Sequence, residues 1–151
     1  MKSITDVAFV VQSRLNSEII PKKMIKDFKG TTLLDLVLEK LVNTEIIPNN
    51  QIYLSVHEDE LVEVGKKYPI NIHKRSWESA NCDNGIEVMF DWWDKLPFKY
   101  VVMISGCNPL LKKSTINNFI KTYLNSEHDG LFSVVEKKNY FWNRSGELIN
   151  D

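Results

Sequence analysis

The sequence predicts an α/β fold with a mainly parallel sheet, because segments of strand character alternate with segments of helical character. The continuous apolar run over 7–11 is typical of a strand that is covered on both faces. Apolar residues at helical spacing follow over 32–42. With 43% hydrophobic and 26% charged residues, the 151 residues are sufficient to bury a core. We therefore expect a single domain over 1–151.

The later elements are expected to continue this alternation. Strands are predicted from short apolar or β-branched runs, and helices from apolar residues three or four positions apart. In order, we expect a strand over 51–56, a short helix ending near Gly65, a strand over 70–73, a helix capped by Asp83, a strand over 100–104, a helix over 116–124 and a strand over 131–135. In the helix that Asp83 would cap, Met89, Phe90 and Trp93 share one face, which predicts that they pack in the core.

The polar segment after the first strand carries Arg14, Ser17 and Lys23. It stands at the carboxyl end of a strand, where open parallel sheets collect their ligands. A planar guanidinium, a mobile ammonium and the N–H groups of a tight turn all suit the oxygens of a triphosphate. These residues alone leave two interpretations open, since Arg14 and Lys23 are either phosphate contacts or solvated loop charges.

This segment resembles the signature of the nucleotide-sugar cytidylyltransferases, above all the acylneuraminate (CMP-sialic acid) synthetases, which is roughly P-A-R-x-x-S-K-R-I-P-x-K. The matching residues are Arg14, Ser17, Ile20, Pro21 and Lys23. The resemblance implies a three-layer nucleotide-diphospho-sugar transferase (Rossmann-like) fold whose loop wraps CTP. It also implies that Arg14 and Lys23 are catalytic residues that neutralise phosphate charge.

The sequence departs from this signature at four positions. Gln12 and Ser13 replace the Pro-Ala pair, and Glu18 and Ile19 stand where a basic pair is usual. One cationic contact is therefore lost, and an acidic side chain is placed near the phosphates. The nucleotide-binding residues that the resemblance implies are Ser13, Arg14, Leu15, Asn16, Ser17, Lys23, Arg75 and Ala80.

A second stretch, over 73–83, resembles the family's R-P-x-x-L-A-x-D segment, which contacts the cytosine end of the nucleotide. Arg75 and Ala80 keep the spacing, while Cys82 stands at the aspartate position. A guanidinium together with backbone carbonyls can distinguish cytosine from uracil, because the two bases present different donors and acceptors. On the residues alone, Arg75 is equally well interpreted as a surface side chain near the start of a helix.

A third stretch, over 101–111, resembles L-Q-P-T-S-P-L-R of the sialic acid synthetases and Q-G-D-E-P-L of the related Kdo cytidylyltransferases. Ser105 and Asn108 are the expected hydrogen-bonding groups for the sugar acid. The family resemblance implies Mg²⁺ as cofactor, but Cys107 stands where the Kdo enzymes carry a magnesium-binding aspartate. A soft thiol is a poor ligand for a hard ion, so the sequence does not identify the metal ligands.

Taken with the loop, these stretches imply transfer of CMP from CTP to a nonulosonic, sialic-acid-like sugar acid, with release of pyrophosphate and with a homodimer as the assembly. Phe141 and Trp142 match an F-W segment beyond which family polypeptides continue. We therefore expect either a fragment or a shortened protein that kept the nucleotide fold. A non-catalytic nucleotide-binding or assembly domain, and a related transferase that uses another base, are the alternatives.

The overall charge and the cysteines narrow the class of protein further. The 19 basic and 20 acidic residues give a net charge of −1, which argues against a nucleic acid or an anionic membrane as partner. Cys82 and Cys107 lack metal-ligand spacing, so we expect free thiols. Since neither a signal peptide nor a membrane span is indicated, we expect a cytoplasmic protein.

Overall fold

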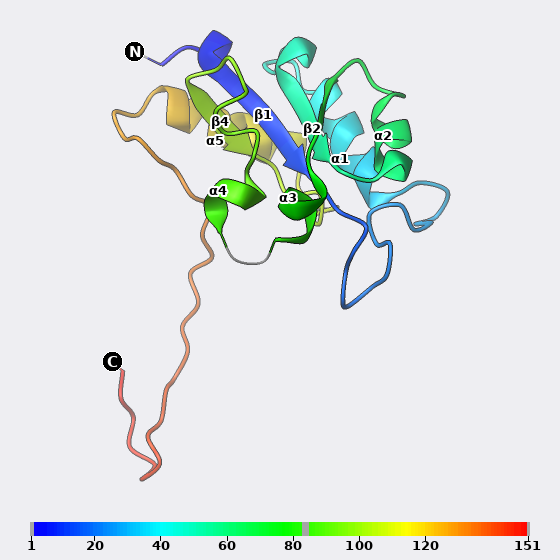
Figure 1. The fold of residues 1–151 in the computed structure, drawn as a ribbon. Coiled ribbons are helices and arrows are strands. Elements are labelled where there is room, and N and C mark those ends of the chain that lie inside the picture. The colour runs from blue at the N-terminus through cyan, green and yellow to red at the C-terminus, as the bar shows by residue number, and fades with distance from the viewer. Residues whose placement is uncertain (1, 83–84, 151) are drawn as a thin grey trace.

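The computed structural model describes residues 2–82 and 85–150 and has the predicted α/β architecture (Figure 1). The strands are β1 (Val7–Gln12), β2 (Ile52–Val56), β3 (Asn71–Lys74) and β4 (Tyr100–Met103). The α-helices are α1 (Leu33–Val42), α2 (Asp59–Gly65), α3 (Trp77–Asn81), α4 (Ile86–Met89) and α5 (Lys113–Leu124), and the 3-10 helices are η1 (Ile4–Asp6) and η2 (Asn49–Gln51). Asp83, the predicted helix cap, lies outside the described residues.

The four strands form one sheet in the order β3-β2-β1-β4, and every neighbouring pair is parallel. Phe9 in the middle of β1 is in register with Ile52 of β2 on one side and with Val102 of β4 on the other. Since β2 and β3 extend the sheet to one side of β1 and β4 extends it to the other, the direction of the chain's path changes at β1. Such a switch point leaves a crevice outside the carboxyl ends of the two strands, where ligands bind.

Both faces of the sheet are covered, as a three-layer fold requires. Val7, Phe9 and Val11 point to the face that packs against α1, α2 and α5. The alternate residues Ala8 and Val10 point to the opposite face and contact the segment that contains α4. The five apolar side chains of β1, at positions 7–11, are fully buried, which explains the continuous apolar run in the sequence.

The predicted packing of Trp93 in the core is wrong. α4 ends at Met89, so the helical spacing that placed Trp93 beside Met89 does not continue to that position. The side chain of Trp93 is 72% exposed, whereas its neighbour Trp92 is 1% exposed and packs against Ala8 and Val10. Trp92, and not the predicted Trp93, therefore packs its indole against the sheet.

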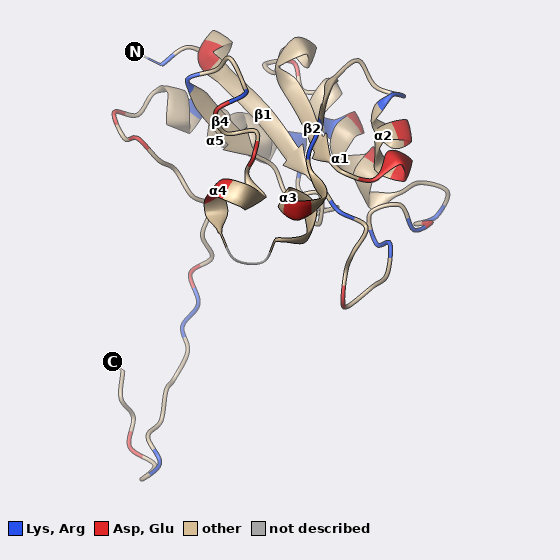
Figure 2. Cartoon of the chain, in the orientation of Figure 1, with Lys and Arg blue, Asp and Glu red and all other residues tan. Residues whose placement is uncertain are grey.

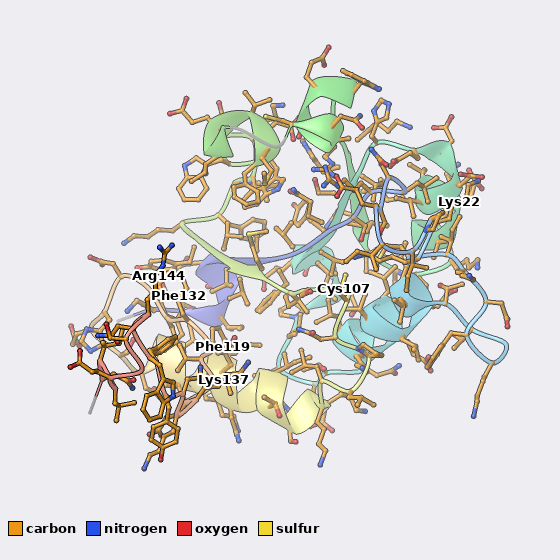
Figure 3. All side chains as sticks on the ribbon, turned by 90° about the horizontal axis from the view of Figure 1, so that it is seen from below. Lys22, Cys107, Phe119, Phe132, Lys137 and Arg144 are labelled. Carbon is orange, nitrogen blue, oxygen red and sulfur yellow. The ribbon has the colours of Figure 1, made fainter. Side chains whose placement is uncertain are left out.

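The predicted strand over 131–135 is also wrong, because the described residues 125–150 form no strand paired with the sheet. Figure 1 shows this segment running away from the sheet and helices. Phe132, Val134 and Val135 are exposed, and Phe132 lines a groove beside β4 together with Phe119 of α5 (Figure 3). A strand requires a hydrogen-bonded neighbour, so strand-forming residues alone do not make one here.

No helix within the described residues has the length and the apolar character that crossing a membrane requires.

Candidate functional site

Two cavities share residues at the carboxyl end of the sheet. The first, the β1–β4 cavity, has a volume of about 380 Å³ and is lined by the loop after β1 and by residues 105–107 after β4. The second, the β1–α3 cavity, has a volume of about 210 Å³ and lies between the end of β1 and the region of α3. Gln12, Ser13 and Arg14 line both cavities. A single ligand could therefore extend from one cavity into the other, across the switch point of the sheet.

The β1–β4 cavity brings together most of the loop residues that the sequence predicts. Arg14, Asn16, Ser17 and Lys23 all line it, and so does Glu18. The loop between β1 and α1 carries charges of both signs, with basic residues in excess (Figure 2). Two cations and several polar groups around an open cavity suit a ligand with several anionic oxygens, while the Glu18 carboxylate opposes that charge.

Arg14 stands between the two cavities. Its side chain is exposed, and its Nη1 donates to the carbonyl oxygen of Ala80 in α3 at 3.3 Å. Ala80 itself is 2% exposed and lines the β1–α3 cavity, so two residues predicted from separate stretches do meet in space. The contact directs the guanidinium across the boundary between the cavities.

Arg75 is a buried residue, so the alternative interpretation of a surface arginine is wrong. It is 3% exposed, and its Nη2 donates to the carbonyl oxygen of Ser13 at 3.0 Å. Its Nη1 donates to the carbonyl oxygen of Ser79 at 3.4 Å. Burial lowers the pKa of the guanidinium, and the negative charge of Glu58 opposes that shift. Arg75 therefore ties the end of β1 to α3, and only its Nε, among its side-chain nitrogens, has no hydrogen-bond partner.

The backbone N–H and the backbone carbonyl of Ser13 both form hydrogen bonds. Its N–H donates to the carbonyl oxygen of Ser55 at 3.1 Å, and its own carbonyl oxygen accepts from Arg75. The Ser13 hydroxyl is buried and has no hydrogen-bond partner. Ser13 and Arg75 both line the β1–α3 cavity, although the Ser13 hydroxyl and the Arg75 Nε themselves have almost no accessible surface.

The sequence interpretation missed Glu58, which holds the start of the loop. Its Oε1 accepts from the backbone N–H of Leu15 at 2.8 Å. Leu15 was predicted to bind nucleotide, but it lines neither cavity and packs against the core. The available signal was the position of Glu58 two residues after β2, because the carboxyl ends of neighbouring parallel strands lie close together.

The segment after β4 divides the two predicted sugar-binding residues. Ser105 lines the β1–β4 cavity, and its hydroxyl accepts from the backbone N–H of Cys107 at 3.3 Å. Asn108 is exposed and lines neither cavity, so the structure does not bring it to the site. Between them, Gly106 approaches Met24 closely, since a Cβ at this position would lie 2.6 Å from the Met24 Cε.

The described residues identify no set of ligands for Mg²⁺. Within residues 2–82 and 85–150, no group of three or more His, Cys, Asp and Glu side chains is placed to hold a metal ion. Cys107 lines the β1–β4 cavity with a thiol, which a hard cation disfavours. Cys107 is a free thiol, as predicted, and the Cys82 Sγ lies 3.9 Å from the carbonyl oxygen of Gly85.

Comparison with known proteins identifies the family of this chain. The family model described as cytidylyltransferase matches residues 8–145, and the chain belongs to this family. The chain is 22% identical over 138 residues to N-acylneuraminate cytidylyltransferase A of Danio rerio, covering 90% of this chain and 32% of that protein. It is 26% identical over 136 residues to a pseudaminic acid cytidylyltransferase of Campylobacter jejuni, covering 84% of this chain and 57% of that protein.

A solved structure shows the same fold. It is a CMP:2-keto-3-deoxy-manno-octonic acid synthetase complexed with CTP, which superimposes with a TM-score of 0.65 at 11% identity, over 78% of this chain and 46% of that one. The predicted nucleotide-diphospho-sugar transferase type of fold is thus confirmed. The chain spans from about a third to just over half the length of these relatives.

Proposed function

We propose that this chain forms the nucleotide-binding part of a cytidylyltransferase that transfers CMP from CTP to a sialic-acid-like sugar acid and releases pyrophosphate. The observation that carries the proposal is the pair of cavities that share Gln12, Ser13 and Arg14 at the switch point of the sheet. The larger cavity is lined by Arg14 and Lys23, and the smaller one is lined by Ser13, Arg75 and Ala80. This division suits a nucleotide, which joins a polyanion to a planar base.

In this arrangement the triphosphate lies in the β1–β4 cavity, where Arg14 and Lys23 offset its charge. The cytosine enters the β1–α3 cavity, beside Ser13, Arg75 and Ala80. The acceptor sugar approaches from the side of Ser105, which lines the first cavity. Relatives named for acylneuraminate and for pseudaminic acid support a sugar acid as the acceptor.

The reaction needs no nucleophile from the protein. A hydroxyl oxygen of the sugar acid attacks the α phosphorus of CTP and loses its proton to water, while the bond to the bridging oxygen of the β phosphate breaks. Pyrophosphate leaves with the electron pair, and the sugar remains joined to CMP. Arg14 and Lys23 contribute by positioning the phosphates and by stabilising the charge on the departing pyrophosphate.

A non-catalytic nucleotide-binding or assembly domain is the second candidate. It is favoured by Glu18 and Cys107, which place a carboxylate and a thiol in the wall of the phosphate-side cavity. A domain of this kind would bind CTP without turning it over. The family's homodimer remains a proposal for the whole protein and can be measured by analytical ultracentrifugation.

The test is calorimetric titration of the folded chain with CTP, with and without Mg²⁺, using UTP and GTP as controls. We expect binding that is selective for CTP. No binding of any triphosphate, or equal binding of all three, would contradict the proposal. Pyrophosphate release with a panel of sugar acids then separates the transferase from the non-catalytic domain, because only the transferase releases pyrophosphate in the presence of an acceptor.

A further inference from the structure

Gln12 is held at the boundary of the two cavities by a residue distant in sequence. It is the last residue of β1 and lines both cavities. Its side-chain Oε1 accepts a hydrogen bond from the Nε1–H of Trp92 at 2.7 Å. This contact joins the end of β1 to the segment that packs on the Ala8 and Val10 face of the sheet, opposite to α1, α2 and α5.

The hydrogen bond fixes which end of the Gln12 amide faces the cavities. An indole N–H is only a donor, so the atom that meets it must be the amide oxygen and not the amide nitrogen. The amide NH₂ group of Gln12 is therefore directed away from Trp92. No other hydrogen bond of the Gln12 side chain is present among the described residues, which leaves both N–H donors available to a ligand.

Trp92 is a rigid anchor for this orientation. It is 1% exposed and packs against Ala8 and Val10 of β1. The ring of Phe90 lies beside it, with 5.5 Å between the ring centroids. A tightly packed indole has little freedom to move, so the Gln12 amide is held in one orientation before a ligand arrives.

We propose that Gln12 is a specificity-determining residue whose amide N–H donates to a neutral oxygen of the nucleoside, either the pyrimidine carbonyl or the ribose 2′-hydroxyl. The inference rests on the proposed function, because it assumes that a nucleotide occupies both cavities. Arg14 and Lys23 already provide charged donors for the phosphates. An uncharged, pre-oriented donor at the boundary instead matches the neutral part of the ligand that must cross it.

The main test compares calorimetric CTP affinities of the wild-type chain with those of Q12E and Q12A. Q12E keeps the size of the side chain and an acceptor for Trp92, but replaces the free donor with an acceptor. We expect its CTP affinity to fall by at least about tenfold, and that of Q12A by a smaller factor. The control is N50D, which makes the same chemical change on an exposed residue before the amino end of β2 and should leave the affinity unchanged.

Two analogues identify the oxygen that Gln12 meets. If the acceptor is the ribose 2′-hydroxyl, Q12A and wild type will bind dCTP equally, although they differ for CTP. If the acceptor is the ring carbonyl, Q12A and wild type will instead bind 2-thio-CTP equally, because sulfur replaces the oxygen that accepts the hydrogen bond. If the difference between Q12A and wild type persists with both analogues, Gln12 does not donate to a nucleoside oxygen and the inference fails.

A second readout separates ligand contact from a structural role. In ¹H–¹⁵N spectra, the side-chain amide signal of Gln12, identified by its loss in Q12E, should shift when CTP is added. Wild-type-like affinity of both variants would overturn the inference and leave the proposed function intact. Failure of the wild-type chain to bind any triphosphate would overturn both. Urea denaturation of each variant confirms that the compared proteins are folded.

Discussion

The two arginines of the site differ in exposure and in their hydrogen bonds. This difference suggests that one of them contacts a ligand and that the other stabilises the surrounding structure. Arg14, which lines both cavities, is exposed, and its Nη1 donates to the carbonyl oxygen of Ala80. Arg75, on the base side, is buried and donates to two backbone carbonyls. The same residue type therefore provides an exposed charge at one position and a buried link between backbone segments at the other. Substitutions should consequently separate binding from stability.

The largest effect is expected for R75M, which keeps an apolar side chain of similar length but removes the guanidinium. The carbonyl oxygens of Ser13 and Ser79 lose their buried donor, so the free energy of unfolding should fall by about 3 kcal/mol. Urea denaturation measures this change. R14M is the matched control and should alter stability by no more than about 0.5 kcal/mol, because Arg14 is exposed. Equal effects of the two variants would remove the proposed difference between the arginines.

The next effect concerns the phosphate side. K23Q should weaken CTP binding by about 1 to 3 kcal/mol, because a charge-assisted contact is lost, and R14A should do the same. Isothermal titration measures both. Lys22 supplies a close control, because it pairs with Glu60 at 2.7 Å, lines neither cavity and lies at the edge of the molecule (Figure 3). K22Q should bind CTP as the wild type does, and an equal loss in K22Q and K23Q would contradict the assignment of Lys23 to the site.

A third effect falls on the residue that holds the loop. E58Q keeps an acceptor for the Leu15 N–H but removes the negative charge that favours the buried Arg75 cation. We expect the free energy of unfolding to fall by about 1 to 2 kcal/mol, as measured by urea denaturation. E60Q changes an exposed carboxylate nearby in the chain and should alter stability by less than about 0.5 kcal/mol. A wild-type stability of E58Q would show that its charge does not support Arg75.

Features that a short segment determines by itself were predicted from the sequence, whereas features that depend on contacts between distant segments were not. The four strands and the helices over 33–42 and 113–124 were predicted within a few residues, because each has a periodic apolar pattern that burial requires. The family signature singled out Arg14 and Lys23, which both line the β1–β4 cavity, and their contact with a nucleotide stays a prediction. Both are properties of short segments.

What the sequence could not predict depends on contacts between distant segments. The burial of Arg75 requires the carbonyls of Ser13 and Ser79 to converge on it, and nothing in its own neighbourhood indicates this. The choice of Trp92 over Trp93 depends on where α4 ends. The segment over 131–135 has strand-forming residues, but pairing requires a neighbour that its sequence does not specify.

The smallest effect is expected at Asp91. It tests whether an ionised carboxylate supports α3, which lies beside the β1–α3 cavity. His73 Nε2 lies 3.1 Å from Asp91 Oδ1, and the Asp91 Oδ2 accepts from the backbone N–H of Ser76, which caps α3, at 3.5 Å. Burial opposes the ionisation of Asp91, but the hydrogen bond and charge of His73, with help from Lys95, hold its pKa below the ordinary 3.8. D91N should therefore lower the free energy of unfolding by about 1 kcal/mol near pH 5.

The pH dependence of this loss gives a sharper test, because the folded-state pKa of Asp91 is depressed. The stability that Asp91 contributes is fully present above pH 3.8 and is lost as the pH falls through the lower folded-state value. Wild type and D91N should thus converge in urea denaturation below pH 3.8. D94N, which changes an exposed carboxylate, should differ from wild type by a small amount that does not shrink over the same range. A constant difference for D91N would mean that Asp91 supports α3 as a hydrogen-bond acceptor alone, and that the ionised groups of the site are confined to the phosphate side and Arg75.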